Sequence, residues 1–120
     1  MLNSSEYKLI YAHYLDKNGY KAEALKLFKE ALSEGETGSA VHIANIYDSL
    51  SQEAEAAEYL AIDANYGHVG SMLRLAEIYS NAESPRKEKA IYWAEQVLIS
   101  SNKGSYYSEK ASELLIRVKD

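Results

Sequence analysis

Residues 43–47 read Ile-Ala-Asn-Ile-Tyr, and residues 75–79 read Leu-Ala-Glu-Ile-Tyr, so equivalent positions differ by 32 in residue number. We call this difference the repeat interval. Counted back from Ala44, it reaches Ala12, which also follows a large side chain and has a tyrosine, Tyr14, two positions later. A second register has the same interval in Ala24 and Ala56, Gly35 and Gly67, and Gly38 and Gly70. Two registers with one period indicate an internal repeat.

The third unit is longer than the other two. From Ala56 to Ala90 the residue number rises by 34, as it does from Gly70 to Gly104. The two extra residues fall between Tyr79 and Ala90, where the stretch from Ser80 to Pro85 is rich in turn-forming residues.

Each unit has the pattern of two amphipathic helices, because its apolar residues recur at helical spacing. The stripes are Ala40, Ile43, Ala44 and Tyr47; Met72, Leu75, Ala76 and Tyr79; Ala24, Leu27, Phe28 and Ala31; Ala56, Tyr59, Leu60 and Ala64; and Ala90, Trp93 and Val97. Asn3 with Glu6 predicts an N-terminal capping box, and Gly19, Gly35 and Gly67 predict left-handed helix ends. We expect the repeated alanines at helix crossings, and most of the eleven tyrosines and Trp93 in the gaps between hairpins.

The predicted fold is all-α: a right-handed helical-repeat solenoid, or α/α superhelix, of three helical hairpins and a closing helix. The units are expected at about 4–35, 36–67 and 68–103, with the closing helix at 104–119, in one domain over 1–120. A stripe of Tyr107, Ala111, Leu114, Leu115 and Val118 predicts the inner face of the closing helix. Its polar outer face is typical of a terminal cap.

Composition excludes several function classes. A net charge of −5 argues against a nucleic-acid binder that neutralises phosphates. The absence of cysteine removes disulfides, thiolate metal sites and cysteine nucleophiles. No signal peptide and no apolar run long enough for a membrane span are visible, so we expect a cytoplasmic protein. A periplasmic location stays open if a leader was removed.

Motifs for chemistry are absent from the sequence. His13, His42 and His68 are the three histidines, and no two of them have the i, i+4 spacing of a helical metal site. The glycines around Ser39 and Ser71 recur with the repeat, which favours a turn between hairpins over a phosphate-binding loop. There is no nucleophile elbow. We therefore expect no catalytic residue, no metal site, no cofactor and no enzyme activity.

Several segments resemble the Sel-1-like repeat family, which is related to the tetratricopeptide repeats. The segments Lys89–Trp93, Glu23–Gly35 and Ala64–His68 are similar to the family's Lys-Ala-x-x-Trp-Tyr…Ala-Ala…Gly pattern. Residues 43–47 and 75–79 are similar to its Leu-Gly-x-x-Tyr segment, with alanine in place of glycine. The resemblance implies non-catalytic protein–protein binding on a curved surface. It also implies that some small relatives in bacteria act as adaptors or as immunity proteins that neutralise toxins.

The first helix of each hairpin is expected to line a concave groove. The predicted partner-binding residues flank its apolar stripe: Glu6, Leu9, His13, Asp16, Val41, Asn45, Asp48, Leu73, Glu77 and Ser80. Asp16 and Asp48 are separated by one repeat interval and would place two carboxylates in one groove; simple solvation at helix ends is the alternative. Such a groove suits a basic or amphipathic protein partner.

Negative charge is concentrated in the middle of the chain. No Lys or Arg occurs from Glu30 to Leu73, while the acidic residues there are Glu30, Glu34, Glu36, Asp48, Glu53, Glu55, Glu58 and Asp63. Two functions remain open: an interaction scaffold for a cellular protein, and an immunity protein that covers a toxin with a basic active site. The sequence predicts neither the partner nor the oligomeric state.

Overall fold

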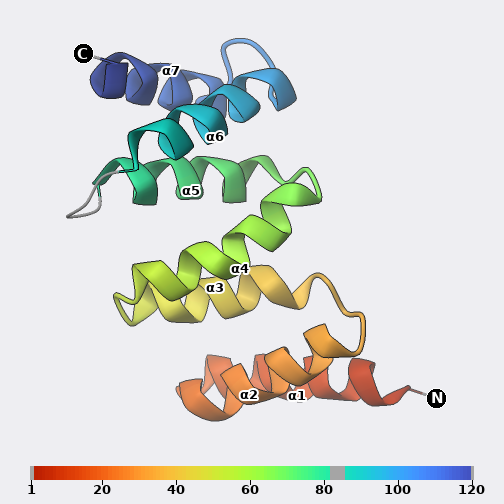
Figure 1. Cartoon of the computed structure of the whole chain (residues 1–120). Coiled ribbons are helices and arrows are strands. Elements are labelled where there is room, and N and C mark those ends of the chain that lie inside the picture. Colours follow the sequence, from red (N-terminus) through yellow and green to blue (C-terminus); the bar gives the residue numbers. More distant parts are fainter. Residues whose placement is uncertain (1, 82–85, 120) are drawn as a thin grey trace. The chain divides into compact units, whose positions relative to one another are not determined.

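A computed structural model describes residues 2–81 and 86–119 of the chain. Within these residues there are seven α-helices and no strand (Figure 1): α1 (Ser4–Lys17), α2 (Lys21–Ser33), α3 (Ser39–Ser49), α4 (Glu53–Asn65), α5 (Val69–Asn81), α6 (Lys87–Ser100) and α7 (Tyr106–Lys119). The all-α class, the three hairpins and the closing helix are confirmed. None of the helices in these residues is long and apolar enough to cross a bilayer. Residues 82–85, part of the stretch assigned to the insertion, lie outside the described residues.

The helices form two compact units, which are distinct from the three repeat units predicted above. We call them unit 1 (Met1–Ile62) and unit 2 (Asp63–Asp120). In unit 1, α2 packs on both α1 and α3. In unit 2, α6 packs on both α5 and α7, and α5 also contacts α7. The single domain expected over the whole chain stays a prediction.

Small residues allow the helices of unit 1 to pack closely. Ala12 and Ala24, which were predicted to lie at helix crossings, are completely buried, and so are Ala31 and Ala40. The large member of this core is Phe28, also fully buried, with Ile43 and Ile46 beside it. Burying a side chain of this size stabilises the fold by about 1.5–3 kcal/mol. Close packing on alanine therefore sets the positions of α1 and α3 relative to α2.

Small buried residues also allow close packing of the helices in unit 2. Ala76, Ala90, Ala94 and Ala111 are completely buried, one or two on each of α5, α6 and α7. Leu75 and Val97 fill the remaining space and are also without exposed surface.

Helix ends follow the local signals in the sequence. The Asn3 side chain accepts a hydrogen bond from the Glu6 backbone N–H at 2.9 Å, which caps α1. Gly19 has φ of +88° and closes α1: its N–H donates to the Asp16 carbonyl, and the Tyr20 N–H donates to the Leu15 carbonyl at 2.8 Å. Gly35 and Gly67 also have positive φ, as predicted.

The end of α3 has the same geometry without a glycine. Ser51 is the counterpart of Gly19 one repeat interval later, and it adopts φ of +60°. The Gln52 N–H donates to the Tyr47 carbonyl at 2.9 Å, which matches the bond made after Gly19. A side chain in this left-handed conformation costs about 1 kcal/mol relative to glycine.

Most tyrosines do not fill gaps between hairpins, and this expectation from the sequence was wrong. Tyr47, Tyr59 and Tyr79 are half-buried, as is Trp93. The others are exposed: Tyr7, Tyr11, Tyr14, Tyr20, Tyr66, Tyr92, Tyr106 and Tyr107. The reason is the close approach of helices over buried alanines, which leaves no space for a ring between them.

Candidate protein-binding surface

Two histidines from different helices meet on the surface of unit 1. His13 of α1 and His42 of α3 have ring centroids 4.4 Å apart, at an interplanar angle of 83°. Phe28 of α2 lies below both rings, with centroids 5.0 Å from His13 and 5.2 Å from His42. Because Phe28 is fully buried, it fixes the position of both imidazoles. The histidine pair therefore joins one side of α1 to the solvent side of α3.

The predicted residues of α1 lie along this side of the helix. Glu6 and His13 are exposed, and Leu9 is half-buried against the core. Asp16 is half-buried and forms an ion pair with Lys21 of α2. A partner that used the Asp16 carboxylate would have to compete with Lys21 for it.

The predicted residues of α3 share the face that points away from the core. Asn45 is exposed, while Val41 and Asp48, which lie on one flank of it, are half-buried. Helical spacing places His42 on the other flank of Asn45. We call His13, His42, Val41, Asn45 and Asp48 the α1–α3 surface.

The predicted residues of unit 2 do not form a comparable surface. Leu73 is 6% exposed, so the prediction that it offers an apolar anchor to a partner was wrong: its side chain belongs to the core of α5. Glu77 is half-buried. The Ser80 hydroxyl donates to the Glu77 carbonyl at 2.9 Å and accepts a bond from Arg117 of α7 at 3.2 Å.

Much of the negative charge in the middle segment has a partner inside the chain. Lys8 of α1 forms ion pairs with both Glu30 and Glu34. The hydrogen bond to Glu34 and the nearby charge of both carboxylates raise the pKa of Lys8 above 10.5. Glu36 accepts a hydrogen bond from the Ser5 hydroxyl at 2.9 Å. The acidic residues between Glu30 and Leu73 therefore do not form a continuous acidic surface.

The acids of the first two turns of α4 are the ones turned to solvent. Glu53, Glu55 and Glu58 are all exposed. Carboxylates in the first turn of a helix are favoured by its dipole, which is a local reason for two of the three. They lie on a different helix from the residues predicted on α1 and α3.

A lysine and two tyrosines lie side by side across α2, α3 and α4. The Lys29 ammonium donates to the Tyr47 hydroxyl at 2.6 Å and lies 5.1 Å from the ring centroid of Tyr47. The same ammonium is 5.9 Å from the ring centroid of Tyr59, which stacks on Tyr47. The hydrogen bond to Tyr47, partly offset by desolvation, raises the pKa of Lys29 above 10.5. Lys29 therefore stays charged throughout the physiological range and anchors α3 and α4 to α2.

The third histidine is exposed and bonds to a buried aspartate in unit 2. Asp63 is 3% exposed, and its carboxylate accepts bonds from the Ser71 hydroxyl and from His68, whose Nδ1 is 2.6 Å away. Serine and histidine both bond to the aspartate rather than to each other, so histidine is not placed to take the serine proton as in a catalytic triad. These bonds tie the end of α4 to the start of α5.

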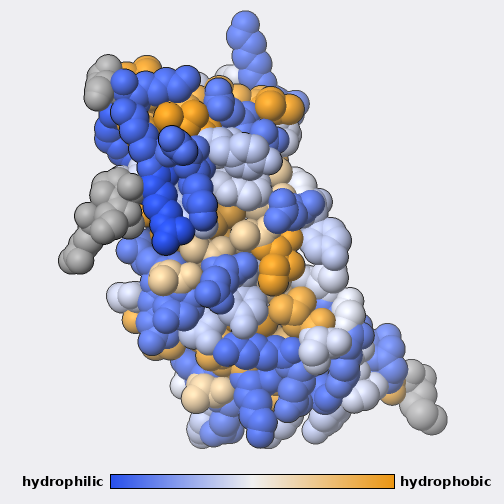
Figure 2. Space-filling view, viewed as in Figure 1, coloured by the Kyte–Doolittle hydropathy of each residue, from blue (hydrophilic) through white to orange (hydrophobic). Residues whose placement is uncertain are grey.

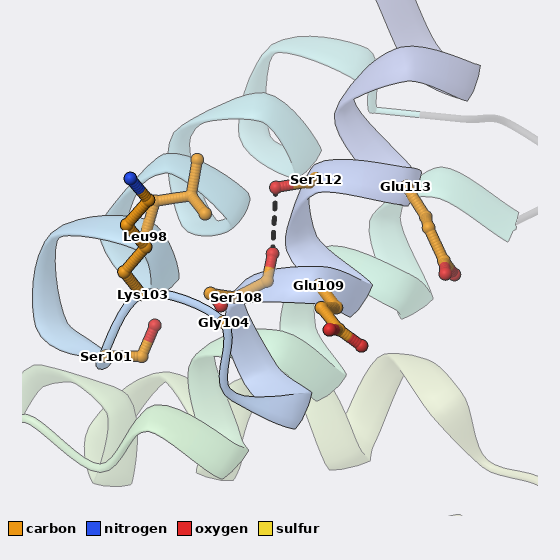
Figure 3. Close-up of a pocket in the computed structure, with 8 residues that line it drawn as sticks. All are labelled: Leu98, Ser101, Lys103, Gly104, Ser108, Glu109, Ser112 and Glu113. Atoms are coloured by element: carbon orange, nitrogen blue, oxygen red, sulfur yellow. Dashed lines mark hydrogen bonds between the residues drawn. The ribbon is translucent and has the colours of Figure 1, made fainter.

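An open depression of about 490 Å³ lies between α6 and α7 (Figure 3). Its serine hydroxyls already bond to backbone carbonyls: Ser112 to Ser108 at 2.8 Å, Ser108 to Ser105 at 3.0 Å, and Ser101 to Val97 at 2.6 Å. Small-molecule sites need polar groups directed at the ligand. The serine hydroxyls of this depression do not serve that purpose, because each already bonds to a backbone carbonyl.

No group of three or more potential metal ligands occurs in the part of the chain that the structure describes. Figure 2 shows one face, mostly hydrophilic over α2 and with hydrophobic residues in small separate areas.

Among solved structures, the chain is similar to the crystal structure of a Sel1 repeat protein from Oxalobacter formigenes, with a TM-score of 0.62. The chain has the fold of a Sel1 repeat protein. The alignment covers 97% of this chain and 58% of the other, at 15% sequence identity. No family model and no curated protein matches the sequence. The Sel1-type fold inferred from the segments around Ala44, Ala76 and Ala90 is thus confirmed at the level of structure.

Proposed function

We propose that the chain is a non-catalytic protein-binding module, and that the α1–α3 surface of unit 1 is where its partner docks. The observation that carries the proposal is the contact between His13 and His42, because it brings residues of two helices into one exposed area. The fully buried Phe28 beneath it holds both rings in place before any partner binds. Pre-organised side chains lose little entropy on binding.

The chemistry of this surface favours a basic or amphipathic segment of another protein. Asp48 supplies a carboxylate, Val41 supplies partly exposed apolar area, and Asn45 supplies an amide. Carboxylates that flank apolar area fit the basic residues that border the apolar side of an amphipathic helix. The net charge of −5 assists the approach of such a partner.

Charge reversal tests this proposal. Affinity capture from cell extract with the full chain isolates bound proteins, and calorimetry then gives the Kd of each purified partner. Asp48→Lys is expected to raise that Kd at least tenfold, because it places like charge opposite a basic segment. Glu95→Lys, at an exposed position of α6, is the matched control and should leave the Kd unchanged. Equal binding by both variants would show that the partner docks elsewhere.

A second function rests on the exposed acids of α4. Glu55 and Glu58 present carboxylates that suit an inhibitor covering a basic active site, as an immunity protein does. In that case Glu55→Lys with Glu58→Lys would abolish binding while Asp48→Lys would not. The captured partner would also be toxic when expressed alone. A harmless partner would leave the first function as the proposal.

A further inference from the structure

The first helix of unit 1 carries a stripe of large side chains that faces solvent. Tyr7, Ile10, Tyr11 and Tyr14 are 56%, 58%, 43% and 62% exposed. At about 100° per residue they span an arc of about 100° on the side of α1 away from its buried residue Ala12. We call these four residues the α1 stripe. An exposed stripe of aromatic and aliphatic residues is typical of an interface.

The repeat shows what these positions do elsewhere in the chain. The counterparts of Tyr11, one and two repeat intervals later, are Ile43 and Leu75, and both are completely buried. The counterpart of Tyr14 is Ile46, which is 1% exposed. These positions therefore form packing faces in the later hairpins. In α1 the same face is exposed, although its positions correspond to those that pack against other helices in the later hairpins.

We propose that the α1 stripe docks a second copy of this chain by antiparallel packing of α1 on α1. A two-fold axis at the midpoint between residues 10 and 11 places Tyr7 opposite Tyr14 of the second copy. The same axis places Ile10 opposite Tyr11. The 3-1-3 spacing of the stripe reads the same in both directions, which is what an isologous interface requires.

Charge at the edge of the stripe favours this partner and this direction. Glu6 and Lys17 are exposed and lie on the same edge, roughly 70–90° from the centre of the stripe by helical spacing. Antiparallel packing brings Glu6 within about two residues, or about 3 Å along the axis, of Lys17 in the second copy. Parallel packing about a two-fold axis along the helices would put these edges on opposite sides of the interface, where Glu6 and Lys17 do not meet. Opposite charges at flanking positions stabilise the antiparallel pair, and the parallel pair has no such contact.

The area of the stripe indicates a weak, reversible dimer. An aromatic side chain can bury about 150–250 Å², and those of the stripe have about half their surface available. The four residues would then bury on the order of 400 Å² per copy, about half of what each side of a standard interface buries. Such an interface belongs to the weak, transient class, so self-association is expected only at high protein concentration.

Sedimentation velocity with the full chain over a range of concentrations measures this equilibrium. Tyr11→Ser and Tyr14→Ser are each expected to raise the dimer Kd at least tenfold. Neither should unfold the helix, because both side chains point to solvent. Tyr106→Ser is the matched control, since Tyr106 is 65% exposed on α7, and it should leave the Kd unchanged.

Charge reversal tests the direction. Glu6→Lys and Lys17→Glu should each weaken self-association, because each creates two like-charge contacts in the antiparallel dimer. An equimolar mixture of these two variants should associate more tightly than either alone, since every contact then joins a lysine to a glutamate. A chain that stays monomeric at several hundred micromolar overturns the proposal, as does a dimer whose Kd ignores the stripe variants. The proposal is also overturned if the stripe variants weaken binding of a different protein and leave self-association unchanged.

Discussion

Replacing each of two serines at equivalent repeat positions by alanine should change the free energy of unfolding in opposite directions. Ser39 begins α3 with no exposed surface, and its hydroxyl has no hydrogen-bond partner among the described residues. Ser71, its counterpart in the next repeat, is 4% exposed and donates to the buried carboxylate of Asp63. The difference arises because the counterpart of Asp63 in unit 1 is Ala31, which has no acceptor.

The magnitudes follow from these two environments. An unsatisfied buried hydroxyl costs about 1–3 kcal/mol, so Ser39→Ala should raise the free energy of unfolding by about 1 kcal/mol. A hydrogen bond to a charged group contributes about 1.5–3 kcal/mol, so Ser71→Ala should lower it by about that amount. For a chain of this size, 1 kcal/mol corresponds to a change in Tm of about 4 °C.

Urea denaturation followed by circular dichroism at 222 nm gives both free energies. The two variants remove the same oxygen atom at equivalent helix positions, so each is the control for the other. Equal destabilisation by both substitutions would refute the reasoning, because it would mean that the Ser39 hydroxyl makes a stabilising hydrogen bond in solution.

Three other predictions concern a helix end, a buried alanine and a charged hydrogen bond. Ser51→Gly should raise the free energy of unfolding by about 1 kcal/mol in urea denaturation, because φ of +60° suits glycine. Ala44→Leu should lower it by about 1–3 kcal/mol, since Ala44 is 1% exposed at a helix crossing; a neutral result would place it elsewhere. The pKa of Lys29 is raised above 10.5 by its bond to Tyr47, so its contribution is complete below pH 10.5 and is lost as the pH rises through the folded pKa. The stability difference between the wild type and Lys29→Met should therefore shrink above pH 10.5 in Tm measurements.

The architecture was predictable because it depends on features that recur along the chain. The constant spacing of Ala12, Ala44 and Ala76 predicted the helix pairs, and all three alanines are buried as expected. The left-handed helix ends at Gly35 and Gly67 were equally readable, since few residues other than glycine adopt positive φ.

Features that depend on tertiary contacts could not be read in the same way. The meeting of His13 and His42 involves non-equivalent repeat positions, so no spacing rule predicts it. Leu73 was placed on the surface because hydropathy alone does not distinguish the two flanks of a largely apolar helix. Net charge was also a poor guide to the surface, because Lys8 comes from another helix to pair with Glu30 and Glu34.

The division into two units has a consequence for how unfolding can be observed. The single tryptophan of the chain, Trp93, is half-buried in unit 2 and packs edge-on against Tyr92, at 5.0 Å between ring centroids. Its fluorescence therefore reports on unit 2, whereas the helical signal comes from both units. Coincidence of the two transitions is a standard sign of a single cooperative unfolding step. One natural fluorophore thus allows the cooperativity between the halves of this repeat protein to be measured without any label.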